Sequence, residues 1–229
     1  MPYGILINAS SVLIGGLIGG FAGNKVPERL RNALPTVFGF AAFAMGILKV
    51  VDTQNLTVVI LSLIVGAIIG ELLDLEHKLE RISKWAIQKV SHKKETNKLA
   101  VELLVMAMVA FCVSGTGIFG ALEEGFTGDA SILLSKSILD FSTAVIFSSV
   151  VGYSIALVSL PQIIILSLVY LGAGFISPLM SPYVLGNFLA VGGIVTIMIG
   201  AQMSKMAKIK AANAIPAIAL VILLSLMIH

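Results

Sequence analysis

Lys136 and Asp140 are four residues apart within an apolar stretch, a spacing that places both charges on one face of a helix. Ionisable side chains in a membrane helix are costly when they face lipid, so we expect both to face the protein interior or a water-filled cavity. There they could coordinate or gate a polar solute or an ion. The alternative is structural, with the two side chains pairing only to fix their helix.

A glycine-rich segment precedes this pair. Five glycines lie between residues 115 and 128, and each weakens a helix by up to about 1 kcal/mol relative to alanine. Non-helical backbone at membrane depth is tolerated only inside protein or beside water. We therefore predict a break near Ser114 to Gly117, where freed amides and carbonyls would meet a solute.

Further polar residues extend this candidate pathway on both sides of the break and into the first apolar run. In the alternative interpretation, residues 121–131 are only an outer loop. The candidate solute or ion pathway comprises Asn8, Ser114, Gly115, Thr116, Gly117, Glu123, Glu124, Asp129, Lys136, Asp140, Ser142 and Thr143.

The elements that must position these residues are membrane helices. The chain is 58% hydrophobic and 12% charged, with a mean hydropathy of +1.03, which is far more apolar than a soluble domain. We predict an all-α polytopic bundle of about eight transmembrane helices. Their approximate ranges are 4–23, 34–51, 57–73, 100–120, 132–158, 161–177, 184–203 and 211–228.

Basic residues predict how these helices cross the bilayer, because cationic flanks mark the cytoplasmic side. All but two of the fifteen Lys and Arg residues fall into three clusters, between predicted spans one and two, three and four, and seven and eight. Both termini should then face outward. The turn at 159–161 should be cytoplasmic but carries no charge; a kink there would change the span count. The clusters are Lys25, Arg29 and Arg31; Lys78, Arg81, Lys84, Lys89, Lys93, Lys94 and Lys98; and Lys205, Lys208 and Lys210.

Residues 74–98 form the one sizeable polar segment. Apolar residues recur there at helical spacing with Lys and Glu opposite, which indicates a helix in the cytoplasmic interface. The alternatives are a solvated linker helix and a partner-docking helix.

Glycines cover two adjacent faces of the first predicted span. Gly15, Gly19 and Gly23 are spaced by four, as are Gly16 and Gly20. Small residues at this spacing let helices approach closely in lipid. Tight packing within the chain is one interpretation, and a homo-oligomer formed through a glycine face is the alternative.

The two halves of the chain resemble each other weakly. Residues 64–70 resemble 194–200, and Pro27 with its neighbours resembles Pro161 with its own. Four spans separate such pairs, which predicts a parallel 4+4 repeat, as in some transporters. We expect one membrane domain over 1–229, with 1–98 as the first half and 99–229 as the second.

Several function classes lack their motifs. There is no HExxH zinc motif and no GxxxxGK[ST] phosphate loop. The net charge of +3 is spread over three membrane boundaries, so it is no nucleic-acid footprint. With one cysteine and no histidine in a predicted span, we expect no metal site, no cofactor and no catalytic residues. An intramembrane glutamate protease using Glu123 and Glu124 would lack the histidine it needs.

The chain resembles a family of bacterial membrane proteins catalogued as domain of unknown function 554, also called the YdfK/YqgA-like family. The most specific resemblance runs from Gly117 through Glu123, Glu124 and Asp129 to Asp140, and similarity extends over essentially the whole chain. The resemblance implies a multi-pass protein of the bacterial plasma membrane, suspected of transport.

These observations predict a transporter or channel-like protein for a small polar or ionic solute, without an ATPase of its own. Its partners would be the lipid bilayer and that solute. A membrane scaffold that recruits a partner through 74–98 is the alternative.

Overall fold

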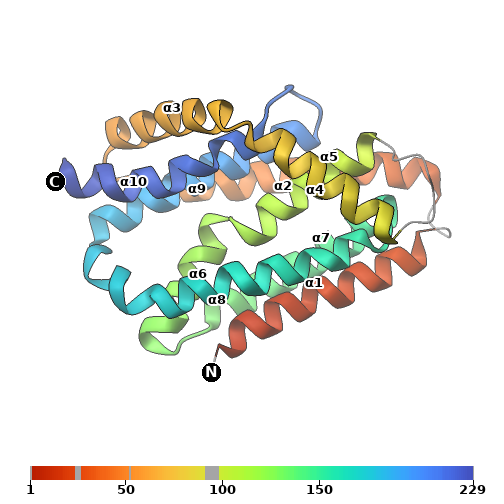
Figure 1. Ribbon diagram of the computed structural model, residues 1–229, viewed down its shortest axis with the longest axis horizontal. Helices are drawn as coiled ribbons and strands as arrows, with labels where there is room; N and C mark the ends of the chain where they lie inside the picture. The colour runs from red at the N-terminus through yellow and green to blue at the C-terminus, as the bar shows by residue number, and fades with distance from the viewer. Residues whose placement is uncertain (1, 24–26, 52, 91–97, 229) are drawn as a thin grey trace.

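The computed structural model describes residues 2–228 apart from 24–26, 52 and 91–97, and the regular elements within them are all helical (Figure 1). Lys25, Lys93 and Lys94 of the basic clusters lie outside the described residues. The elements are α1 (Tyr3–Ala22), α2 (Glu28–Val50), α3 (Leu56–Leu72), α4 (Leu75–Val90), α5 (Lys98–Cys112), α6 (Gly115–Thr127), α7 (Ser131–Val151), the 3-10 helix η1 (Tyr153–Val158), α8 (Ser159–Ile176), η2 (Ser177–Leu179), α9 (Pro182–Met203), η3 (Ala211–Ala214) and α10 (Ile215–Met227).

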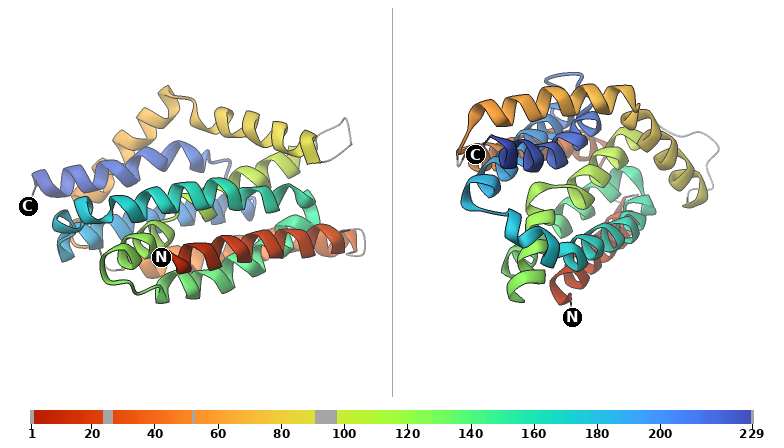
Figure 2. Two further views of the ribbon diagram at one scale, coloured as in Figure 1. Left: turned by 60° about the horizontal axis from the view of Figure 1, so that its bottom comes forward. Right: turned by 60° about the vertical axis from the view of Figure 1, so that its left-hand side comes forward.

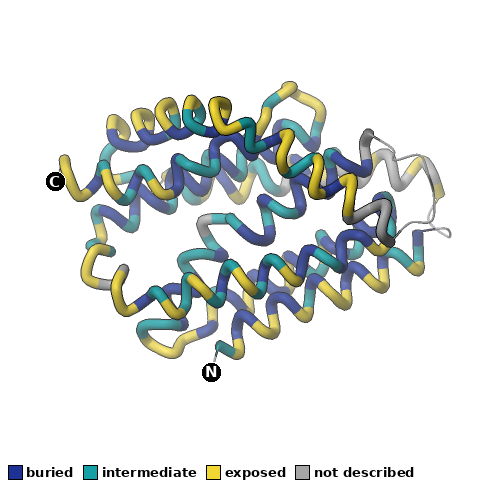
Figure 3. The backbone as a smooth tube through the Cα atoms, in the orientation of Figure 1, coloured by how far each residue is buried: buried dark blue, intermediate teal, exposed yellow. Residues whose placement is uncertain are grey.

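The polytopic helical bundle predicted from composition is confirmed. Within the described residues, five helical segments are long and apolar enough to cross a bilayer, and six if the bent pair Leu56–Leu72 and Leu75–Trp85 is one span. The count of about eight spans stays a prediction. Large apolar side chains such as Ile14, Leu48, Ile68, Leu168 and Phe175 are exposed. Figure 3 shows exposed positions along the outer faces of the helices. Such faces suit contact with lipid.

The helices form two groups, joined by α5 and α6 (Figures 1 and 2). In the first helix group α1 packs on α7, η1 and α8. In the second helix group α2 packs on α9, and α3 packs on α10, η3 and α9. The broken segment α5–α6 contacts α7 and α8 on one side and α9 on the other.

Glycine explains how closely α1 lies against its neighbours. A Cβ on Gly19 would lie 1.9 Å from the Val145 carbonyl oxygen of α7, and one on Gly16 would lie 2.6 Å from the Ala156 nitrogen of η1. The two glycine faces predicted from sequence are therefore both filled within the chain. Gly15 faces the Phe141 carbonyl oxygen and Gly19 faces that of Val145, four residues later in both helices, so α1 and α7 run in the same direction.

In the second helix group, too, glycines let α3 pack closely against its neighbours. A Cβ on Gly66 would lie 2.4 Å from the Ala217 nitrogen, and one on Gly70 would lie 1.9 Å from the Asn213 carbonyl oxygen. So α3 docks on η3 and α10 much as α1 docks on η1 and α8.

The turn between the fifth and sixth predicted spans is not where the sequence placed it. The fifth span was expected to continue to residue 158, but α7 ends at Val151 and Gly152 takes a φ of +84°. This left-handed conformation suits glycine, which has no Cβ to clash. Residues 153–158 instead form η1, which leads into α8, and Pro161 lies in the first turn of α8.

A polar cluster lies where α3 meets α4, with a bend of 56° between the two helices. Asn213 donates to Glu71 at 2.5 Å, Lys210 donates to Glu71 at 2.8 Å, and Glu76 Oε2 accepts from the Ala212 amide at 3.1 Å. The Asn213 Oδ1 atom also accepts from the Glu76 amide at 2.8 Å. We call Glu71, Glu76, Lys210 and Asn213 the end cluster. It ties the bend to the η3 segment.

Helix α4 matches the first part of the polar segment predicted over 74–98, and residues 91–97 lie outside the described residues. Its Ile82 and Trp85 side chains are exposed. The predicted repeat and the boundary after residue 98 stay predictions. The helices pack across that boundary, since α1 packs with α7, α2 with α9 and α3 with α10.

Candidate functional site

The ion pair predicted from sequence spacing forms inside the first helix group. Lys136 Nζ lies 2.5 Å from Asp140 Oδ2, and the two side chains are only 7% and 9% exposed. The ammonium group also lies 5.8 Å from the centre of the Phe111 ring on α5. A buried ammonium is thereby compensated by one carboxylate and one aromatic face.

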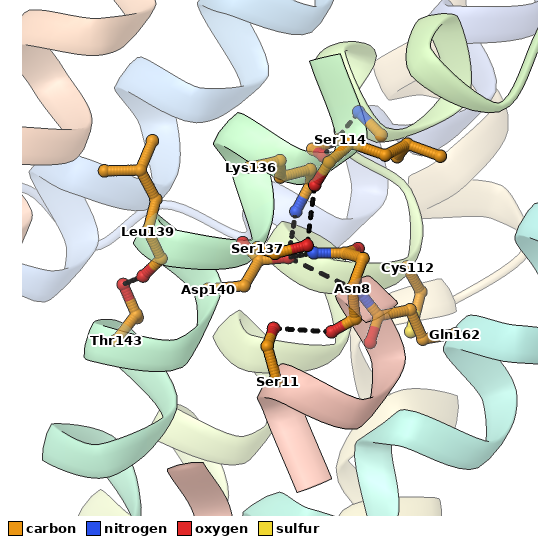
Figure 4. A network of polar contacts seen from close by, with 12 residues as sticks. Asn8, Ser11, Cys112, Ser114, Lys136, Ser137, Leu139, Asp140, Thr143 and Gln162 are labelled. Carbon is orange, nitrogen blue, oxygen red and sulfur yellow. Dashed lines mark hydrogen bonds and ion pairs between the residues drawn. The ribbon is translucent and has the colours of Figure 1, made fainter. Parts of the chain in front are cut away.

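Two buried amides complete the pair. Asn8 Nδ2 donates to Asp140 Oδ2 at 2.9 Å, and Gln162 Nε2 donates to Asn8 Oδ1 at 2.7 Å. A longer contact of 3.4 Å joins Gln162 Nε2 to the same Asp140 oxygen. Figure 4 shows these side chains converging from α1, α7 and α8. We call Asn8, Lys136, Asp140 and Gln162 the buried polar cluster.

The helix break predicted at Ser114 is confirmed and lies beside this cluster. Helix α5 ends at Cys112, Ser114 takes an extended conformation, and α6 begins at Gly115. The Ser114 hydroxyl accepts from the Gly117 amide at 3.2 Å and so caps α6. A Cβ on Gly117 would lie 3.1 Å from the Lys136 Cε atom. Glycine at this position leaves room for the lysine stem.

A cavity of about 530 Å³ lies between the two helix groups, with walls from α2, α5, α6, α7 and α9. One end of the cavity lies at Lys49, in the last turn of α2, and at Ser131, the first residue of α7. The other end lies at Met203, the last residue of α9. Most of its wall is apolar. The predicted pathway residues among its lining are Ser114, Thr116, Lys136, Asp140, Ser142 and Thr143.

Ser142 and Thr143 each use their hydroxyl hydrogen within α7. They donate to the carbonyls of Ile138 and Leu139 at 3.0 and 2.9 Å. Their oxygen lone pairs are left to face the cavity as acceptors. Among the described residues of the cavity wall, the charged side chains are Lys49, Lys136 and Asp140, so cations outnumber anions among them by one.

Two of the three predicted outer carboxylates serve other contacts. Glu124 is buried and accepts from the amides of Gly4 at 2.7 Å and Ile5 at 3.3 Å, which caps the start of α1. The Asp129 carboxylate accepts from the Ser131 hydroxyl and amide, and these bonds lower the pKa of Asp129. Glu123 lies in α6. None of the three is among the residues that line the cavity.

Comparison with known proteins places this architecture in a family. The family model described as "Protein of unknown function (DUF554)" matches residues 3–226. The chain belongs to the DUF554 family. The uncharacterized protein YqgA of Escherichia coli (strain K12) is 39% identical over 227 residues, covering 98% of this chain and 97% of the relative. The uncharacterized membrane protein YdfK of Bacillus subtilis (strain 168) is 26% identical over 231 residues, covering 99% and 97%.

No solved structure matches this DUF554 chain. Over the described residues, no group of three or more His, Cys, Asp and Glu side chains could hold a metal ion.

One member of the DUF554 site was missed from sequence. Gln162 follows Pro161 and is not among the pathway residues predicted from sequence, yet it is fully buried and binds two of the other cluster residues. A signal was present, because it is an amide within an otherwise apolar membrane helix, and polar residues there face protein or water.

Proposed function

We propose that this protein carries a small polar or ionic solute across the bacterial plasma membrane, without an ATPase of its own. The observation that supports this best is a buried Lys136–Asp140 pair on the wall of a cavity of about 530 Å³. Charges at membrane depth are costly and mark solute or ion pathways. A closed structural pair would not need a cavity beside it.

The two helix groups suggest how access could alternate. The cavity lies between them, and α5–α6 contacts both. In our proposal the first helix group moves as a body, since the backbone of α1 touches that of α7. Rocking it against the second helix group would expose Lys136 and Asp140 to each side in turn.

The orientation follows from the basic clusters. We propose that the α1–α2, α4–α5 and α9–η3 connections face the cytoplasm and that both termini face outward. The described helices support this arrangement, since α1 and α7 run in the same direction and share the end at which they start.

The test is solute flux in proteoliposomes that contain the full chain. A broad panel of small polar and ionic solutes is first screened with the parent protein. Asp140→Asn and the double variant Lys136→Met/Asp140→Asn are then compared, because the double variant removes both charges and leaves no buried ion. We expect both variants to lose flux. The double variant should keep its elution and melting close to the parent's, whereas Asp140→Asn alone leaves the Lys136 ammonium buried without its carboxylate and should be destabilised. Unchanged flux in both would refute the site, and no flux of any solute would refute transport.

A scaffold is the second candidate, favoured by the exposed apolar side chains of α4. Ile82 is 50% and Trp85 is 60% exposed on this amphipathic helix. In that function the variant Ile82→Glu/Trp85→Glu would lose a co-purified partner, and no solute would bind. Retained flux in this variant would favour transport.

A further inference from the structure

The Gln162 side chain leaves one polar atom unpartnered inside the protein. Gln162 Oε1 is the buried side-chain nitrogen or oxygen, within the described part of the chain, that no hydrogen bond reaches. Meanwhile Asp140 Oδ2 accepts from Lys136, Asn8 and Gln162 together. Buried polar groups are normally satisfied, so an orphaned acceptor calls for one more donor or cation.

The chemistry of the cluster suits a hard cation. Asn8, Asp140 and Gln162 each carry a side-chain oxygen, on α1, α7 and α8. Both amides present their NH2 groups to Asp140 in the structure described here, and a half-turn of each amide would present its oxygen instead. Amide carbonyls and carboxylates are the ligands that alkali and alkaline-earth cations prefer. With a single carboxylate, the site balances one positive charge, and Lys136 supplies that charge in the structure described here.

We propose that a sodium ion binds among Asn8, Asp140 and Gln162 and takes the place of the Lys136 ammonium. The freed ammonium then holds the anionic group of an organic solute in the cavity. This inference rests on the proposed transport function and names its substrate class and its coupling ion.

Charge balance makes the two binding events depend on each other. With the pair closed, the charges of Lys136 and Asp140 cancel. With sodium at Asp140 and an anion at Lys136, the charges cancel again. Either ligand alone leaves one uncompensated charge inside the membrane, which is costly. The fully empty and the fully loaded forms are therefore the two favoured states, and sodium and solute bind cooperatively.

The cavity supports the class of solute. Lys136 lies at its wall beside Phe111 and Ser114, so its ammonium can turn toward the cavity without leaving the protein. Leu139, Phe147 and Ile199 contribute apolar wall, and Lys49 adds a second cation toward one end. Such a space suits a small organic anion with one charged group and an apolar body.

Binding of radiolabelled sodium to the purified full chain in micelles, with benzoate present as the accompanying anion, tests the cation site. Saturable binding is expected in the parent and in Thr196→Val, a control that alters a cavity hydroxyl outside the cluster. Gln162→Leu, which removes the orphaned oxygen and little volume, should weaken binding by about tenfold or more. Absent binding, or equal binding in Gln162→Leu, would overturn the cation site.

Titration with benzoate, a monoanion with an apolar body, tests the coupling. Sodium chloride in place of choline chloride should tighten benzoate binding by about 5- to 150-fold, the usual range for coupled sites. In Lys136→Met/Asp140→Asn the difference should vanish. Benzoate binding that is equal in both salts, absent in both, or enhanced equally by acid in choline chloride would overturn the proposal.

The two proposals fail in different ways. Solute flux that proceeds equally in sodium and in choline would leave transport standing and refute sodium coupling. Sodium binding that depends on Gln162, with no flux of any solute, would leave the cation site standing and refute transport.

Discussion

The two helix groups share a construction but hold their polar residues at different depths. In each, a glycine helix docks on a 3-10 helix and the helix that follows it, with Gly16 against Ala156 and Gly66 against Ala217. The buried polar cluster of the first group lies inside the membrane-length apolar segments Tyr3–Ala22, Ser131–Val151 and Tyr153–Phe175. The end cluster of the second group lies at a helix boundary, where Lys210 and Glu71 are 44% and 61% exposed.

Similar residue types therefore have different roles in the end cluster and in the buried polar cluster. A Lys, a carboxylate and an amide at a helix end satisfy backbone groups and shape the α3–α4 bend, and water screens their charges. The same types inside the bundle sit beside a cavity, where charge is costly. Depth and the neighbouring cavity, more than residue type, distinguish the candidate site from a structural network.

The largest expected difference comes from removing one lysine from each cluster. Lys136→Met leaves Asp140 buried without its counter-charge and should cost about 3–5 kcal/mol of unfolding free energy. Lys210→Met breaks an exposed pair and should cost about 1 kcal/mol or less. Unfolding by denaturant in micelles measures both. Adding Asp140→Asn to Lys136→Met should restore most of the loss. Equal costs for the two lysines would abolish the distinction between the clusters.

The shared construction can be tested at the two closest glycine contacts. Gly19→Ala and Gly70→Ala each place a methyl group about where a backbone oxygen lies, at 1.9 Å, so each should cost about 1–3 kcal/mol. Gly174→Ala meets nothing within 4 Å and should be neutral or slightly stabilising. Melting temperatures of the three variants provide the measurement. A large cost at only one of the two contacts would mean that the groups are not built alike.

Interactions between residues close in sequence could be predicted from the sequence, and interactions between distant residues could not. The Lys136–Asp140 pair is local to one helix turn, the break at Ser114 follows from glycine content, and both were predicted. Asn8 was predicted as a pathway residue, but its bonds to Asp140 and Gln162 were not predicted, because these partners lie 132 and 154 residues away and only tertiary packing joins them. The role of Glu124 was hidden for the same reason, since its bonds reach Gly4 across 120 residues.

Glu124 offers the next test, since sequence alone placed it in the pathway. Its carboxylate accepts two amides at the start of α1, where negative charge is favoured by the helix dipole. Glu124→Gln keeps an acceptor but loses the charge, so we expect a cost of about 0.5–2 kcal/mol. Glu123→Gln is the neighbouring control and should change stability little. A loss of flux in Glu124→Gln with unchanged stability would return this residue to the pathway.

The smallest effect concerns acid dependence in the end cluster. Burial raises the pKa of Glu76 above its ordinary value of 4.5, and the bond from the Ala212 amide opposes that rise. Ionising Glu76 therefore opposes folding, so its contribution to stability is greatest below pH 4.5 and is lost as the pH rises through the raised pKa. Glu76→Gln cannot ionise and should be slightly more stable than the parent near neutral pH. Melting curves from acid to neutral pH should show the two proteins diverging, and parallel curves would contradict this.

The long reach of the buried polar cluster bears on how the protein is made. Asn8 enters the membrane with α1, but its hydrogen-bonding partners belong to α7 and α8, which are synthesised last among the three. Until then Asn8 carries an amide in an apolar setting, and the glycine faces of α1 have no neighbour to fill them. The newly synthesised α1 must therefore stay beside the translocation machinery, or bound to a chaperone, until more than half of the chain has been synthesised after it. Assembly of the site is then a late event in biogenesis, completed only when α8 is in place.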